Sequence, residues 1–393
     1  MTRVAVLGGG PAGSVAAARL AAAGVETVLL DEKLAWEKPC GGGITWKAYS
    51  QYPFLIENEA PRRVVQRTLL SETRAGTAAL ELTEPLLIYS RKDLNGLLLE
   101  RAARLGTRIE KERALGLERH GSGWRVRTRA GSIEADYLIV ATGARNSLRE
   151  VGTQYTAADT MCALGYYVPG AQEHVDIQFF PGFEGYIWAF PRQDHLSVGI
   201  CGKGQSSAAM RARLEQWMDD RGLSRKDAVF YGHMIPALER SSWPSNRIAG
   251  EGWAAVGDAA GLVDPVTGEG IYYAVRSGDL AAQALLDVHC PPESAHLRYR
   301  ALLDNDFIED LTFGAGLAKR FFLQQVLRAS VPGRMIEFMR RSPSMTRIVQ
   351  DLFAGTQNYL ALKKRLLGSL NGTMHELVMG AILSQRVVKE GEA

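Results

Sequence analysis

The chain has 393 residues, of which 46% are hydrophobic and 23% charged, and its formal net charge is +3. This length suits two or three domains, since a domain takes roughly 100 to 200 residues. The small charge argues against nucleic acid as a partner, and no apolar run reaches the ~18 residues of a membrane span. The four cysteines (Cys40, Cys162, Cys201, Cys290) show neither a C-x-x-C pair nor metal-ligand spacing. They predict no disulfide framework and no metal site, and they indicate a reducing, cytoplasmic compartment.

The N-terminus carries a dinucleotide-binding fingerprint. A short apolar strand at residues 4–7 precedes Gly-Gly-Gly-Pro-Ala-Gly, and an alanine-rich helix is expected over 14–23. This is the G-x-G-x-x-G pattern between a strand and a helix, the context that it requires. Gly8 permits the tight turn, Gly10 lets a pyrophosphate approach the backbone, and Gly13 allows the helix to pack on the strand.

An acidic residue follows the second expected strand, residues 27–30. Asp31 lies 18 residues after Gly13, where a carboxylate bonds the hydroxyls of a ribose. The same carboxylate disfavours a ribose that carries a 2'-phosphate. The fingerprint therefore predicts FAD or NAD rather than NADP.

A glycine loop and a second helix come next. The loop Lys-Pro-Cys-Gly-Gly-Gly-Ile, residues 38–44, can pass close to a planar ligand, and alternating strands are expected near 60–90. The i, i+3, i+4 spacing of apolar residues over 94–102 predicts a helix. Arg91, directly before it, either pairs with a pyrophosphate or is a surface arginine that opposes the helix dipole.

The middle of the chain reads as strands. A hairpin is expected around 121–123, and a buried strand over 137–140 ends in another glycine turn. Of three strands expected between 175 and 200, the second carries Tyr186, Trp188 and Phe190 spaced by two, so their rings share one face of a sheet. Such a face is either core or, beside a flavin, the wall of an apolar substrate pocket.

A second candidate cofactor segment follows the short apolar run at 253–256. Asp258, at the end of this expected strand, either reaches the ribityl hydroxyls of a flavin or acts only as a cap. The chain then turns through Pro265 and Gly268, and a helix is expected to begin near Gly270. Its unpaired amides and positive dipole end would face the ligand. The N-terminal fingerprint favours the flavin interpretation.

The C-terminal part is basic. Residues 311–370 contain ten Lys or Arg residues against Glu337 and Asp351, with apolar residues between them. The pattern indicates either a solvated basic face or peripheral contact with anionic lipid at the inner membrane surface. The ten cations are Lys319, Arg320, Arg328, Arg334, Arg340, Arg341, Arg347, Lys363, Lys364 and Arg365.

Together these motifs resemble the geranylgeranyl reductase family, part of a larger group of flavoproteins that includes aromatic hydroxylases and halogenases. The resemblance covers about residues 1–290 and rests most on the Lys-Pro-Cys-Gly-Gly-Gly loop and on Tyr-x-Trp-x-Phe-Pro at 186–191. The segment 355–359 is similar to a family segment. Aromatic hydroxylases carry an Asp-Gly pair linked to FAD and NADPH, where this chain has Thr142-Gly143. This departure puts direct reduction by a pyridine nucleotide in doubt.

The resemblance implies an α/β fold with a Rossmann-like FAD-binding domain, an inserted β-sheet substrate domain and a helical C-terminal region. We expect the FAD-binding domain at 1–150, interrupted by strands near 60–90 and resuming at about 246–295. The substrate-binding sheet would span 151–245 and the helical region 296–393.

The resemblance also implies reduction of carbon–carbon double bonds in a prenyl lipid or quinone chain by non-covalent FAD. The electron donor stays open, with NAD(P)H and reduced ferredoxin as the candidates. A flavin-dependent monooxygenase or halogenase acting on an aromatic or apolar small molecule is the alternative, and a non-catalytic FAD-stabilised binding protein is a third. The aromatic run resembles the Trp-x-Trp-x-Ile-Pro motif of halogenases, but position 186 is Tyr. The oligomeric state stays open.

The predicted site joins the cofactor motifs to the aromatic strand. Cys40 is expected nearest the isoalloxazine, as a polarizable contact or a proton donor, or else as a small buried thiol. No His or Glu is singled out as the acid. Tyr186 and Trp188 are expected in the substrate pocket, and the predicted cofactor-binding residues are Gly8, Gly10, Ala12, Gly13, Asp31, Cys40, Gly41, Arg91, Ala114, Asp258, Pro265, Gly268, Gly270 and Ile271.

Overall fold

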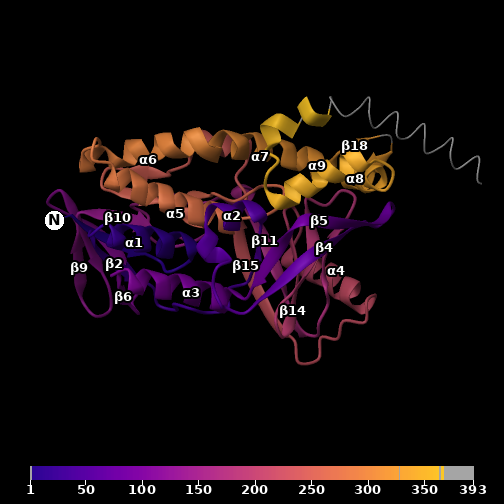
Figure 1. The fold of residues 1–393 in the computed structure, drawn as a ribbon, viewed down its shortest axis with the longest axis horizontal. Coiled ribbons are helices and arrows are strands. Elements are labelled where there is room, and N and C mark those ends of the chain that lie inside the picture. Colours follow the sequence, from indigo (N-terminus) through magenta and orange to yellow (C-terminus); the bar gives the residue numbers. More distant parts are fainter. Residues whose placement is uncertain (1, 327, 363, 367–393) are drawn as a thin grey trace, which may run out of the picture.

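The structure, a computed structural model, describes residues 2–366 except 327 and 363. Lys363 and the last part of the expected C-terminal region, 367–393, lie outside the described residues. The described chain forms a six-stranded sheet, an eight-stranded sheet and two small sheets, with helices packed around them (Figure 1). This mixed α/β architecture confirms the expected fold class.

The six-stranded sheet holds the dinucleotide-binding motifs. Its order is β16-β17-β10-β1-β2-β6, and β1 pairs in parallel with both β2 and β10. Four of the five residues in β1 and in β2 are buried, as expected for parallel strands covered on both faces. The strands are β1 (Arg3–Leu7), β2 (Glu26–Leu30), β6 (Arg108–Glu110), β10 (Tyr137–Val140), β16 (Ala249–Gly250) and β17 (Trp253–Ala255).

Helices α1 (Pro11–Ala22), α3 (Arg91–Arg104) and α5 (Ile271–Leu286) pack beside this sheet. Contact between α1 and α5 is close, because a Cβ at Gly278 would lie only 2.2 Å from the carbonyl oxygen of Ala12. The expected N-terminal βαβ unit and the helix after residue 90 are confirmed. A small sheet of β7 (Gly116–His120), β8 (Gly123–Arg127) and β9 (Ser132–Ala135) contacts the strands β1 and β10.

The eight-stranded sheet has the order β15-β11-β14-β13-β12-β4-β5-β3. Neighbouring strands are antiparallel except β12 and β4, which run parallel. The strands near 60–90 therefore share one sheet with those of 151–245. The strands are β3 (Gly43–Ile44), β4 (Arg62–Glu72), β5 (Gly76–Tyr89), β11 (Thr160–Pro169), β12 (His174–Phe179), β13 (Gly185–Pro191), β14 (His195–Gly202) and β15 (Val229–Pro236).

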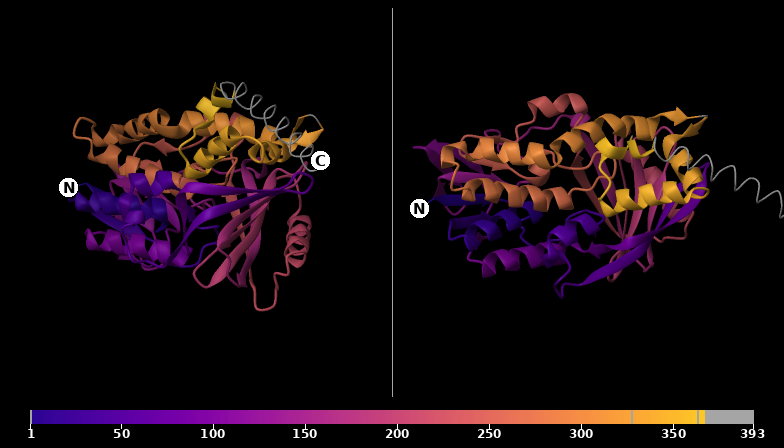
Figure 2. Two further views of the ribbon diagram at one scale, coloured as in Figure 1. Left: turned by 45° about the vertical axis from the view of Figure 1, so that its right-hand side comes forward. Right: turned by 45° about the horizontal axis from the view of Figure 1, so that its top comes forward.

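The two faces of this sheet are covered by different helices (Figure 2). On one face, Ile187 and Ala189 of β13 join a buried cluster with Met210 and Leu214 of α4 (Ser207–Asp219). On the other face, Trp188 joins a cluster that includes Phe322 and other residues of the C-terminal helices. Successive side chains of β13 therefore point to opposite faces of the sheet. One face packs in a closed core, and the other borders the cavity described below.

The C-terminal helices lie along one side of the molecule and extend from the first sheet to the second (Figures 1 and 2). They are α6 (Ala295–Leu303), α7 (Glu309–Leu323), α8 (Val331–Met339) and α9 (Pro343–Ala354), with a π-helical turn at Asp304–Ile308. The C-terminal region also contains a small sheet of β18 (Gln325–Val326) and β19 (Ala329–Ser330). Elsewhere in the chain there is the short helix α2 (Trp46–Gln51). Within the described residues, none of the helices has the length and apolar character needed to cross a bilayer.

Candidate active site

The glycine turn after β1 combines two packed glycines with one open one. Gly8 has a φ of 120°, and a Cβ there would lie 2.2 Å from the carbonyl oxygen of Ala141. A Cβ at Gly13 would lie 2.0 Å from the carbonyl oxygen of Gly8, whereas a Cβ at Gly10 would meet no atom within 4 Å. Gly8 and Gly13 are therefore needed for packing, and Gly10 leaves space for a ligand at the N-terminus of α1.

Asp31 stabilises the same turn through hydrogen bonds. Its Oδ2 accepts a hydrogen bond from the backbone N–H of Gly9 at 2.7 Å, and its Oδ1 accepts from the N–H groups of Lys33 and Leu34, each at 2.7 Å. A carboxylate offers about four acceptor positions, so one remains for a ribose hydroxyl. Asp31 is one of the residues that line the cavity described below.

The segment after β17 brings a charged pair to the cavity. Asp258 Oδ2 lies 3.1 Å from the ammonium nitrogen of Lys38, which comes from the glycine loop. Burial acts to raise the pKa of Asp258, but the charge of Lys38, the hydrogen bond from Lys38 and the charge of Arg91 leave that pKa lowered. The carboxylate is therefore ionised and can accept hydrogen bonds. The helix expected to begin near Gly270 is confirmed as α5, and no described side chain caps its N-terminus.

The loop of residues 38–43 packs against β13 and against the turn that follows this strand. Arg192, only 1% exposed, donates from Nη2 to the carbonyl oxygen of Cys40 at 2.7 Å. Gly42 has a φ of 80°, and a Cβ there would lie 2.1 Å from Arg192 Nη1. The ring of Phe190 supports the flanking glycines, with distances of 3.2 and 3.0 Å to the Cβ positions of Gly41 and Gly43. The loop thus passes over the aromatic strand at close range.

These parts surround one cavity of about 1150 Å³, which is larger than the roughly 300–1,000 Å³ of an ordinary small-molecule pocket. The predicted site residues that line it are Gly10, Ala12, Asp31, Cys40, Gly41, Arg91, Tyr186, Trp188, Asp258, Gly268, Gly270 and Ile271. Gly8, Gly13 and Pro265 do not line the cavity, and Gly13 lies in the first turn of α1. Ala114 is placed in the hydrophobic core, away from the cavity.

The cofactor end of the cavity fits FAD. Three buried polar atoms on its lining, Arg91 Nε, Thr142 Oγ1 and His233 Nε2, have no hydrogen-bond partner among the described residues. Buried polar groups in folded proteins are normally paired, so these atoms indicate a polar ligand. Two helix N-termini and the open position at Gly10 add donors and space for a pyrophosphate. Arg91, expected before α3, is its first residue, with Ser90 as the N-cap.

The other end of the cavity is apolar. One wall is the sheet face with Ile177, Phe179, Tyr186, Trp188 and Phe190. The three aromatic rings of β13 therefore share a face, as their spacing predicted. The opposite wall comes from α7, α8, α9 and the segment after them. Its side chains include Leu317, Phe321, Met335, Phe338, Met345, Ile348, Val349, Leu352 and Phe353.

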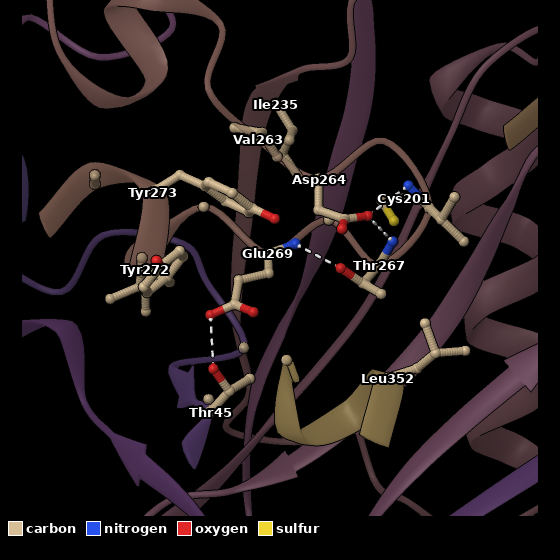
Figure 3. A pocket seen from close by; sticks show the side chains of 18 of the residues that line it. Thr45, Cys201, Ile235, Val263, Asp264, Thr267, Glu269, Tyr272, Tyr273 and Leu352 are labelled. Atoms are coloured by element: carbon tan, nitrogen blue, oxygen red, sulfur yellow. Dashed lines mark hydrogen bonds between the residues drawn. The ribbon is translucent and has the colours of Figure 1, made fainter. Parts of the chain in front are cut away.

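Glu269 is a lining residue to which the sequence analysis gave no role. Its Oε1 accepts a hydrogen bond from Thr45 Oγ1 at 3.3 Å, and Figure 3 shows the carboxylate directed toward that hydroxyl. Burial and the nearby Asp264 raise the pKa of Glu269 to about 7, against the opposing charge of Lys47. The sequence did contain a signal, since this acid stands between two glycines immediately before a helix.

His233, on β15, was also missed. Burial and the nearby cations Lys38, Arg91 and Arg145 lower its pKa, so the imidazole is neutral beside the cofactor end. No local motif marks His233, because only the pairing of β15 with β11 brings it to the cavity.

Asp264 ties the C-terminal segment to the turn before α5. Its carboxylate accepts from the N–H groups of Val266 and Thr267 at 2.9 and 2.8 Å, and from the hydroxyl of Tyr359 at 2.8 Å. Asp264 and Tyr359 are both buried. The segment 355–359, which resembled a family segment, thus closes over the cavity beside Glu269.

Sequence comparisons link the chain to reductases. The family described as pyridine nucleotide-disulphide oxidoreductase matches residues 2–160. The chain is 30% identical over 321 residues to the geranylgeranyl diphosphate reductase of Synechocystis, with 72% of this chain and 75% of that protein covered. It is also 30% identical over 316 residues to the chloroplastic geranylgeranyl diphosphate reductase of Arabidopsis thaliana. That match covers 72% of this chain and 66% of the plant protein, which is just under two thirds of its length.

Solved structures share the fold. A geranylgeranyl bacteriochlorophyll reductase-like protein from Thermoplasma acidophilum superposes with a TM-score of 0.75 at 20% identity, covering 93% of this chain and 98% of the other. A variant of a flavin-dependent brominase gives a TM-score of 0.70 at 16% identity, covering 94% of this chain and 98% of the brominase. At these identities the likeness concerns the fold alone, so it does not separate a reductase from a halogenase.

Proposed function

The chain belongs to the geranylgeranyl reductase family of FAD-dependent oxidoreductases, and we propose that it hydrogenates carbon–carbon double bonds in the prenyl chain of a lipid or quinone. The continuity of the cavity supports this proposal most strongly, because it joins a polar end that fits FAD to a chamber walled by aromatic and aliphatic side chains. A prenyl chain placed there would be removed from water. Each Å² of apolar surface buried in this way would stabilise binding by about 25 cal/mol. Double bonds along the chain would lie in the same space as the flavin ring.

In this proposal, both positively and negatively charged groups at the cofactor end bind FAD. The N-terminus of α1 and Arg91 hold the pyrophosphate, Asp31 bonds the ribose, and Asp258, oriented by Lys38, accepts from the ribityl hydroxyls. The N-terminus of α5, from Gly270 onward, stabilises negative charge on the pyrimidine side of the ring. When bound, reduced FAD supplies a hydride at N5.

The remaining residues position the reactants and exclude water. Gly41 and its neighbours allow the loop to lie against a planar ring, and Cys40 contributes a polarizable contact there. Tyr186 and Trp188 form the wall against which the chain packs. Tyr186 is fixed by donating its hydroxyl hydrogen to the carbonyl oxygen of Thr267, so the wall and the cofactor turn are joined directly.

For the electron donor we propose NAD(P)H or reduced ferredoxin. The turn with Thr142 and Gly143, in place of an Asp-Gly pair, favours a donor that does not bind as NADPH binds to aromatic hydroxylases. Anaerobic bleaching of the flavin absorbance by each donor in turn distinguishes them.

We also propose peripheral contact with anionic lipid through the basic C-terminal region. Lys319, Arg334 and Arg365 are ion-paired with acids, whereas Arg320 and Arg328 are exposed. Leu323 and Val326 near them are 44% and 50% exposed. Arg320 and Val326 also line the cavity, so this basic and apolar rim would bring its opening to the lipid.

The test is an anaerobic assay with dithionite-reduced protein and a prenyl lipid, read by mass spectrometry. A gain of two hydrogen atoms per double bond is the expected result. Incorporation of oxygen or halogen would instead assign a monooxygenase or halogenase, and the absence of turnover with any prenyl lipid would leave a binding role. Because dithionite supplies the electrons, the result of this test does not depend on the physiological electron donor.

A further inference from the structure

Hydrogenation of an alkene needs a proton as well as a hydride, and the cavity offers one acid at the appropriate place. We propose that Glu269 is the catalytic residue that donates this proton, which rests on the reductase function proposed above.

Glu269 lies where three parts of the site meet. Its backbone precedes the N-terminus of α5, where the flavin ring is proposed to lie, and its side chain contacts Thr45 from the segment after the glycine loop. The preceding Gly268 abuts the aromatic wall, since a Cβ there would lie 2.8 Å from the hydroxyl oxygen of Tyr186. The C-terminal segment closes the third side, with the Cβ position of Gly355 lying 3.3 Å from Thr45 Oγ1. A double bond close to the flavin therefore lies close to Glu269.

The surroundings of Glu269 keep a proton on it near neutral pH. The titratable groups that face it are Asp264 in the same turn, Lys47 on α2, and Tyr272 and Tyr273 on α5. Burial and Asp264 raise the pKa, and Lys47 and the hydrogen bonds of Thr45 and the Tyr272 amide lower it, with a result of about 7. An acid with a pKa close to the working pH is protonated often enough to act and strong enough to donate.

Neighbouring groups are less suitable donors. Asp264 already accepts from three donors, two backbone amides and the Tyr359 hydroxyl, and these bonds oppose the rise in its pKa that burial causes. Burial raises the pKa of the Cys201 thiol to about 12 and raises that of Tyr186 well above its usual value. Burial and the cations around His233 lower its pKa, so the imidazole is neutral and has no acidic proton of suitable strength.

One alkene carbon would receive the hydride that bound, reduced FAD supplies, and the other would receive the proton of the Glu269 carboxyl group. The π bond, the N–H bond that held the hydride and the carboxyl O–H bond would break, two C–H bonds would form, and the electron pair of the hydride would leave FAD oxidised. The carboxylate then regains a proton from water before the next turnover.

The decisive variant is Glu269→Gln, which keeps size and polarity but cannot donate an acidic proton. Single-turnover oxidation of the reduced flavin by a prenyl lipid should slow by about 10²- to 10⁴-fold. In the wild type this rate should fall as pH rises through about 7, because the acid is lost. The falling limb should be absent in Glu269→Gln and retained in Glu269→Asp, while Glu100→Gln, at an exposed carboxylate on α3 outside the cavity lining, should behave as the wild type.

A second readout does not depend on turnover. The infrared C=O band of a protonated carboxyl group should titrate near pH 7 in the FAD-loaded protein and be missing in Glu269→Gln. FAD content should be unchanged in the variant. Thr45→Val should raise the midpoint of this titration, because it removes a donor that favours the carboxylate.

Three results would overturn the proposal. If the wild type reduces the lipid and Glu269→Gln keeps its rate and pH profile, the donor is another group and only this inference fails. If Glu269→Gln loses FAD, Glu269 belongs to cofactor binding. If the wild type reduces no prenyl lipid at all, the proposed function fails and the donor role fails with it.

Discussion

The two ends of the cavity are built from different parts of the chain. The cofactor end is shaped by backbone, with glycines at three turns and two helix N-termini, and polar or charged side chains such as Arg91 and Asp258 line it. The apolar end is shaped by side chains from the face of the eight-stranded sheet and from α7, α8 and α9. An added methyl group should therefore do most harm at the cofactor end, and a truncated side chain at the apolar end.

Gly13→Ala should have the largest effect, because its Cβ would lie 2.0 Å from a backbone oxygen that cannot move aside. We expect a loss of about 3 kcal/mol or more in the free energy of unfolding of the apoprotein. Gly10→Ala is the matched control, since its Cβ would meet no atom within 4 Å. It should leave apoprotein stability nearly unchanged and lower FAD occupancy. Denaturant unfolding and flavin absorbance measure the two effects, and equal destabilisation by both variants would contradict the comparison.

At the apolar end, Trp188→Ala and Ile187→Ala separate the two faces of β13. Ile187 is fully buried against α4, so its truncation should cost about 2–5 kcal/mol without changing the chain length of the accepted lipid. Trp188 borders the cavity, so its truncation should cost less than the 3–5 kcal/mol of a core tryptophan and raise the Michaelis constant for the lipid. Flavin content should stay normal in both. A Trp188→Ala protein with full destabilisation and unchanged kinetics would make this ring part of the core only.

The same contrast explains what could be predicted from sequence. The turn at Gly8 to Gly13, Asp31 and the start of α5 depend on neighbours in the chain, so their strand–turn–helix order was readable from local spacing. His233 and Leu352 reach the cavity only through strand pairing and helix packing. Arg192, which fixes the carbonyl of Cys40 from 152 residues away, shows no pattern that marks its partner. Glu269 was visible in its motif, but its role depends on Asp264, Thr45 and burial, which only the folded chain provides.

Tyr359→Phe tests how the C-terminal segment is joined to the cofactor turn. The loss of its hydroxyl removes a donor from the buried Asp264 and should cost about 1–3 kcal/mol. Burial raises the pKa of Asp264, and the bond from Tyr359 opposes that rise. The bond stabilises the ionised carboxylate, so the cost should grow as pH rises through the pKa of Asp264 and shrink in acid. Thermal unfolding from acid to neutral pH measures it, and a cost that is largest in acid would contradict this assignment.

The smallest effect is expected at the rim, where the apolar end meets solvent. Each exposed cation near an anionic surface contributes on the order of 1 kcal/mol, and salt screens it. Arg320→Glu combined with Arg328→Glu should therefore weaken co-sedimentation with anionic vesicles. The same charge change at Arg129, in the turn between β8 and β9, and at Lys226, between α4 and β15, should have little effect because both are exposed away from the cavity lining. Equal recovery on neutral and anionic vesicles, or recovery that high salt does not lower, would exclude the electrostatic mechanism. Loss of binding in both double variants would show that net charge, rather than this rim, determines vesicle binding. No binding by the wild type would make the rim an ordinary solvated surface.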